Sequence, residues 1–203
     1  IIIENILTDN LQAVTDQERS IDVNYEIDGV DSRISPSQGY FFSTSASIYG
    51  SILGGERNYF KTTSQYKYYF KLNRNIIFCS RFQGGYIKIL DGSSYLPTYD
   101  RFFIGGQSSL RGWLNSDELN SRGGLYKILV NLEARTSVYK KLGINYFYDM
   151  GQINQPNGGK IYKPWNIGIG LTYASNLGPI RIDIASPYAD GSITFHLSLL
   201  YMF

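Results

Sequence analysis

Apolar and polar side chains alternate at every second position along most of the chain. Residues 164–175 show this clearly, since one parity holds Trp165, Ile167, Ile169, Leu171 and Tyr173. The intervening positions are small or polar. Successive side chains of a β-strand point to opposite faces, so this period of two predicts strands with one apolar and one polar face. Little of the chain has a helical period, and the fold is therefore predicted to be all-β.

Eight alternating segments follow residue 38, at about 38–49, 57–71, 75–88, 123–135, 138–150, 164–175, 179–186 and 191–203. Residues 20–29 alternate as well, which leaves nine or ten strands open as alternatives. Residues 1–18 differ, because their isoleucines and leucines fall roughly at helical spacing. We expect 1–18 to be a short helical or irregular segment, in the lumen or at an interface, and 19–203 to form one β domain.

Alternation alone fits either a soluble sandwich or a membrane-spanning barrel. Strand length favours the barrel, because these segments run to about 10–14 residues, whereas membrane strands need about 9–11 and soluble strands are usually shorter. The aromatic content of 15%, with 18 tyrosines, suits the aromatic girdles of such barrels. No apolar run is long enough for a transmembrane helix. The chain therefore predicts a transmembrane antiparallel up-and-down β-barrel of about eight strands.

The connections between the predicted strands differ in length on the two sides of the sheet. Short links fall at 72–75, 135–137 and 176–179, while longer, glycine-rich ones fall at 50–57, 88–123, 151–163 and 186–191. Short turns on one side and long loops on the other are typical of outer-membrane barrels. We expect the short turns on the periplasmic side.

Composition excludes several classes of function. The net charge of +2 gives no reason to expect a nucleic-acid partner. His196 and Cys79 are single residues of their kinds, so no metal site with the usual ligand spacing is visible. The chain has no G-x-S-x-G motif, and its glycine pairs follow no phosphate-loop pattern. We therefore expect no catalytic residue, no metal and no cofactor.

The longest predicted loop contains the stretch from Arg101 to Trp113, R-F-F-I-G-G-Q-S-S-L-R-G-W. It resembles the sixth extracellular loop of the C-terminal barrel of the Omp85 superfamily, with matches at Phe103, Gly105, Gly106, Leu110, Arg111, Gly112 and Trp113. The resemblance implies that this loop folds back into the lumen. It also implies that Arg111 meets acidic side chains of the next two strands, at whose positions Glu133 and Asp149 stand.

The alternation independently places Glu133 and Asp149 on the polar, inner face. An arginine in a confined lumen needs charge partners, and a guanidinium can engage two carboxylates. The alternative is that these carboxylates face lumenal water and pair with Arg135 or Arg181 instead.

Two further stretches resemble the same family. Residues 28–39 resemble its D-x-R-x-x-P-x-x-G periplasmic turn, so the resemblance runs from about residue 20 to 203. The last segment ends on an aromatic residue, which resembles the C-terminal strand signal that barrel assembly machinery recognises. Its apolar positions form one row: Phe195, Leu197, Leu199, Tyr201 and Phe203. The resemblance implies the outer membrane of a diderm bacterium, with lipid and the assembly machinery as partners.

The chain also departs from the family pattern. The family usually has sixteen strands preceded by POTRA domains, whereas half a barrel and no POTRA-like segment are expected here, as in the short forms of the family. The interior of an eight-stranded barrel is just filled by side chains, so we expect a plugged barrel without an open pore. Small inward residues would make room for the loop: Ser43, Ser45, Ser47, Gly143, Gly168, Gly170 and Ala174.

Three functions follow from these features. The resemblance implies a minimal barrel that assists insertion or translocation of outer-membrane polypeptides at a weak seam between its first and last strands. The alternative is a structural or dimerising module, in which a second copy covers edges left by imperfect closure. A small enzyme or adhesin that uses loops 88–123 and 151–163 is the least favoured.

Overall fold

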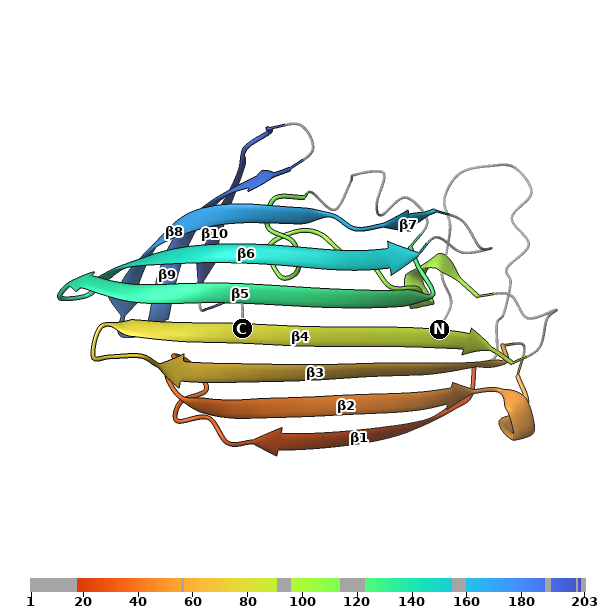
Figure 1. Cartoon of the computed structure of the whole chain (residues 1–203). Coiled ribbons are helices and arrows are strands. Elements are labelled where there is room, and N and C mark those ends of the chain that lie inside the picture. The colour runs from red at the N-terminus through yellow and green to blue at the C-terminus, as the bar shows by residue number, and fades with distance from the viewer. Residues whose placement is uncertain are drawn as a thin grey trace.

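A computed structural model describes residues 18–55, 57–90, 96–113, 123–154, 160–188, 191–199 and 201. Ten strands form one antiparallel sheet (Figure 1). They are β1 (Ser20–Asp28), β2 (Gly39–Tyr49), β3 (Tyr59–Lys71), β4 (Ile76–Ile89), β5 (Tyr126–Tyr139), β6 (Leu142–Asn154), β7 (Ile161–Tyr162), β8 (Trp165–Ser175), β9 (Gly178–Pro187) and β10 (Thr194–Leu199). Short 3-10 turns form η1 (Ser51–Leu53) and η2 (Thr98–Asp100). No helix in these ranges is long and apolar enough to cross a membrane.

The topology is up-and-down, as predicted. The sheet order is β1-β2-β3-β4-β5-β6-β8-β9-β10, with the two-residue β7 attached to β6 alone. Each of the eight segments predicted after residue 38 corresponds to a strand, and residues 20–28 form β1 against β2. The predicted non-barrel segment lies, apart from Glu18, outside the described residues.

The sheet curves like the wall of a barrel, with β9 and β10 passing behind β8 (Figure 1). The path of paired strands begins at β1 and ends at β10. Within the described residues these two strands therefore remain free edges, each with one hydrogen-bonded neighbour.

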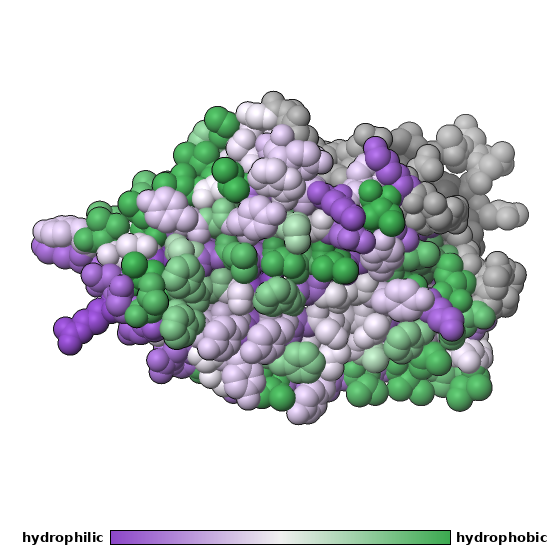
Figure 2. Space-filling view, viewed as in Figure 1, coloured by the Kyte–Doolittle hydropathy of each residue, from purple (hydrophilic) through white to green (hydrophobic). Residues whose placement is uncertain are grey.

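The outer face of the sheet is apolar. Ile167 is 55% exposed and Leu171 is 60% exposed, while the inward Asn131 and Asp149 are completely buried. Figure 2 shows aliphatic and aromatic side chains spread across the visible face. A soluble sheet would expose the polar row instead, so this inversion has the pattern of a barrel wall that faces lipid.

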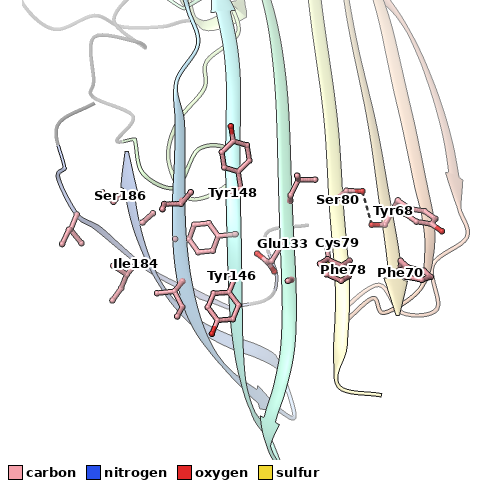
Figure 3. A pocket seen from close by; sticks show the side chains of 18 residues that line it. Tyr68, Phe70, Phe78, Cys79, Ser80, Glu133, Tyr146, Tyr148, Ile184 and Ser186 are labelled. Carbon is pink, nitrogen blue, oxygen red and sulfur yellow. Dashed lines mark hydrogen bonds between the residues drawn. The ribbon is translucent and has the colours of Figure 1, made fainter. Parts of the chain in front are cut away.

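A shallow apolar hollow of about 960 Å³ lies on this outer face across β3 to β9. Figure 3 shows Phe78 of β4 together with Tyr146 and Tyr148 of β6 among its lining side chains. The hollow is part of the apolar outer surface, and few polar groups line it. The polar residues singled out by the sequence lie on the opposite, inner face.

Short turns connect the strands at one end of the sheet, on the left in Figure 1. In the turn between β1 and β2, the carboxylate of Asp31 accepts hydrogen bonds from the backbone N–H of Ser37 at 2.8 Å and of Gln38 at 3.2 Å. Slight burial raises the pKa of Asp31, but hydrogen bonds from Ser37 and Gln38 outweigh it and hold this pKa below its ordinary value. Gly39 follows with φ of +106°, where a Cβ atom would lie 2.1 Å from the Gly29 carbonyl oxygen. The turn therefore needs glycine there.

The last strand corrects one prediction. Phe195, Leu197 and Leu199 form the expected outward row, with exposed fractions of 70%, 72% and 59%. Tyr201 does not continue it, because its ring centre lies 3.7 Å from Cζ of the inward Arg135. The strand ends at Leu199, so the chain has already left the alternation two residues later. Phe203 lies outside the described residues.

Candidate functional site

The loop between β4 and β5 folds back onto the inner face of the sheet. Its entry is fixed by a bridge in which Phe102 and Gly124 exchange backbone hydrogen bonds of 2.9 and 2.8 Å. Gly105 and Gly106 then turn the chain with φ of +120° and +75°. Ile104 and Leu110 pack against two inward residues of the wall, Leu129 and Ile153. This buried apolar contact positions Arg111 on the concave face of the sheet.

The guanidinium of Arg111 lies between two carboxylates and is completely buried. Its Nε and Nη2 donate to Asp149 of β6 at 2.9 and 2.8 Å, and its Nη1 donates to Glu133 of β5 at 2.7 Å. The backbone N–H of Arg111 also donates to Asp149, at 3.2 Å. The structure thus brings together the three charged residues that the family resemblance implied.

Glu133 contacts two more arginines. Arg135 Nε lies 2.7 Å from one of its oxygens, and Arg181 Nη1 lies 2.9 Å from the same oxygen. Arg181 in turn donates to Asp183 at 3.0 Å. The alternative pairings of Glu133 therefore coexist with the Arg111 contact. We call these three arginines and three carboxylates the inner charge cluster: Arg111, Arg135, Arg181, Glu133, Asp149 and Asp183.

Balance of charge explains how six ionised groups share a buried volume. Three positive and three negative side chains compensate one another, and each carboxylate receives several donors. Asn131 and Asn166 add hydrogen bonds of 2.8 and 3.0 Å to Asp149. Removal of any one charge leaves the others partly uncompensated.

An aromatic ring completes the seat of Arg111. The ring centre of Phe147 lies 3.4 Å from its guanidinium carbon, within the range of a cation–π contact. Phe147 occupies space left by Gly168 on the next strand, where a Cβ atom would lie 2.1 Å from the ring. Gly168 is thus one of the small inward residues predicted to make room, and it does so through Phe147.

Strand register brings these residues into neighbouring rows. One row crosses the sheet through Glu133, Phe147, Gly168, Ala185 and Thr194, each paired with the next. A second row, Asn131, Asp149 and Asn166, runs beside it. Arg111 lies over both rows.

The residues that follow Arg111 fit closely against the end of the wall. A Cβ atom on Gly112 would lie 2.5 Å from Cβ of Asn166 and 3.0 Å from the backbone nitrogen of Pro187. Trp113 donates from Nε1 to the carbonyl oxygen of Trp165 at 3.3 Å, and its ring lies 6.0 Å from that of Tyr188.

Gly112→Ala is expected to displace the loop, because backbone atoms and a Cβ atom cannot yield as a flexible side chain would. We expect a loss of about 1–3 kcal/mol in the free energy of unfolding, the cost typical of overpacking. Urea unfolding followed by the heat-dependent shift in gel mobility measures it. Gly84→Ala is the matched control, since nothing lies within 4 Å of the added atom. Equal stability of the two variants would contradict the close fit at Gly112.

The inner charge cluster holds the loop against the inner face of the wall through the side chain of Arg111. In the part of the chain that the structure describes, no three His, Cys, Asp or Glu side chains are placed to hold a metal ion. Sequence reasoning named neither Asp183 nor Phe147 as a neighbour of Arg111, and it missed the contacts of Thr194 and His196 with the loop. All four stand at inward positions of the two-residue alternation, which places them on the inner face but does not show that they lie beside Arg111.

Comparison with known proteins agrees with this geometry. The model of the Omp85 superfamily domain matches residues 3–198. The outer membrane protein assembly factor BamA of Nitratidesulfovibrio vulgaris is 28% identical over 185 residues, which cover 83% of this chain and 23% of that protein. The crystal structure of BamA from Haemophilus ducreyi lacking POTRA domains 1–3 matches with a TM-score of 0.73 and 17% identity, over 87% of this chain and 41% of that one. The chain spans about a quarter of the curated relative it matches, and it belongs to the Omp85 superfamily.

Proposed function

We propose that this chain is part of an outer-membrane barrel that assists the insertion or translocation of outer-membrane polypeptides in a diderm bacterium. The proposal rests on the docked loop with its buried Arg111. This loop carries a family-specific motif and lies on a sheet whose first and last strands, among the described residues, are each paired on one side only. The related BamA is named an assembly factor for outer-membrane proteins, which supports the same role.

The free edges supply a physical mechanism. β1 and β10 each have one paired side, which leaves backbone N–H and C=O groups without strand partners in the described sheet. In hydrocarbon an unsatisfied backbone group costs several kcal/mol, so such an edge favours pairing with another strand. A client polypeptide in extended conformation provides those partners. Outer-membrane lipid covers the exposed apolar row, and barrel assembly machinery inserts the chain during its own biogenesis.

A structural or dimerising role without transport activity is the alternative. Free edges favour it as well, because a second copy also satisfies them. In this alternative the inner charge cluster serves only to hold the loop.

Reconstitution separates the two functions. Purified protein in liposomes is expected to speed the folding of an added client barrel relative to empty liposomes. The variant Arg111→Ala should lose this effect, while Arg74→Ala, which removes an exposed arginine from a short turn, should keep it. If the wild type gives no acceleration and Arg111→Ala alters only its own heat-dependent mobility, insertion is excluded. Native mass spectrometry of the same samples then tests the dimer.

A further inference from the structure

The backbone carbonyl of Arg111 makes two contacts that its side chain does not explain. Thr194 Oγ1 lies 2.7 Å from this oxygen, and His196 Nε2 lies 2.6 Å from it. Both residues come from β10 and share its inner face. Thr194 also lies 3.1 Å from the Ala185 carbonyl on β9, so its shorter bond goes to the loop.

The chemistry of these contacts fixes their direction. A carbonyl oxygen only accepts hydrogen bonds, so both β10 side chains are donors. His196 must therefore carry a hydrogen on Nε2, which holds for its charged form and for one neutral tautomer. The contact thus does not require His196 to be charged.

These hydrogen bonds are important for the attachment of β10, because this strand lies at the edge of the described sheet. β10 pairs with β9 over six residues and has no second neighbour in the described sheet. β5 and β6 bind the side chain of Arg111, but each has strands on both sides. Loss of the loop would therefore leave β5 and β6 in place while removing one of the few attachments of β10.

We propose that Thr194 and His196 are positioning residues that attach the free edge strand β10 to the docked loop, so that the order of this edge depends on loop docking. The inference deepens the proposed function and rests on it for its functional meaning, since β10 is one of the two edges proposed to meet a client. The side chain of Arg111 fixes the loop to β5 and β6, and its carbonyl transmits that position to β10.

Hydrogen exchange measured by mass spectrometry tests the attachment. In the double variant Thr194→Val with His196→Leu, the backbone amides of 191–199 are expected to exchange roughly tenfold faster. This factor corresponds to the net free energy that about one hydrogen bond contributes. Amides of 126–139 should keep their wild-type rates. Arg111→Ala should speed exchange in 191–199 as well, although it changes no residue of β10.

Conservative variants separate positioning from simple loss of stability. Thr194→Ser and His196→Gln keep a donor at each place and should restore slow exchange. Ser198→Ala, the next inward residue of β10, is the matched control and should behave like the wild type. If the double variant does not refold, the single variants Thr194→Val and His196→Leu carry the same comparison.

The proposal is overturned if 191–199 exchanges at the wild-type rate in the variants without donors, or if Arg111→Ala leaves it unchanged. It is also overturned if the conservative variants exchange as fast as those without donors. The exchange readout does not depend on client insertion. Failure of the liposome assay with the expected exchange pattern would therefore reject the insertion function alone, and the reverse result would reject the attachment alone.

Discussion

Arg111→Ala is expected to lower the free energy of unfolding by about 3–5 kcal/mol, the range for removing one partner of a buried ion pair. The substitution removes every side-chain contact with Glu133 and Asp149 and leaves Asp149 with only neutral side-chain donors. Urea titration in detergent micelles, followed by heat-dependent gel mobility, measures the change. Arg74→Ala should stay within about 0.5 kcal/mol of the wild type, as exposed substitutions usually do.

Exchange of charge between Arg111 and Glu133 should not restore stability. Glu133 also binds Arg135 and Arg181, so an arginine at position 133 would face two like charges. The combined variant Arg111→Glu with Glu133→Arg is therefore expected to be at least as unstable as Arg111→Glu alone. Wild-type stability of the combined variant would show a simple pair and contradict the six-residue cluster.

Glu133→Gln is expected to have an effect of similar size, about 3–5 kcal/mol. The substitution keeps shape and removes one negative charge, which leaves three arginines facing Asp149 and Asp183. We expect the loop to detach from the wall, because the uncompensated repulsion among the guanidinium groups acts at the position of Arg111. The same urea titration measures stability, and protease cleavage within 96–113 measures release of the loop.

Glu26→Gln is the matched control for this experiment. Glu26 is exposed on the edge strand β1 and lies 3.6 Å from the exposed Arg33, a pair of the kind that contributes little. Its loss should cost at most about 1 kcal/mol. An equally small effect of Glu133→Gln would mean that water, and not the arginines, stabilises the carboxylate.

Alternation predicted the strands well because it depends only on neighbours in sequence. Each inward or outward assignment follows from the two-residue period, and Arg81, Asn131 and Arg135 all lie inside as their parity requires. The two-residue period no longer predicts the direction of a side chain where strand pairing ends, as at Tyr201. Beyond the last hydrogen bond between strands, the sheet does not determine which way a side chain points. β7 escaped prediction because two residues are too few to show a period.

The inner charge cluster could be predicted only in part. The family resemblance supplied Arg111, Glu133 and Asp149, because it concerns residues at matching positions. Asp183 and Phe147 required knowledge of register, which depends on pairings between distant strands. A shift of one strand by two residues would keep every face and still separate Phe147 from Gly168.

The chain has two tryptophans, and both lie where the loop meets the wall. Trp113 of the loop donates to the carbonyl of Trp165, and the ring of Tyr188 lies 5.2 Å from the Trp165 ring in a stacked arrangement. Indole emission depends on local polarity and on nearby aromatic rings. Release of the loop would move Trp113 away from these rings and into another environment, while Trp165 would stay on β8. The unlabelled protein therefore contains its own fluorescent reporter of loop docking, which can be read in real time.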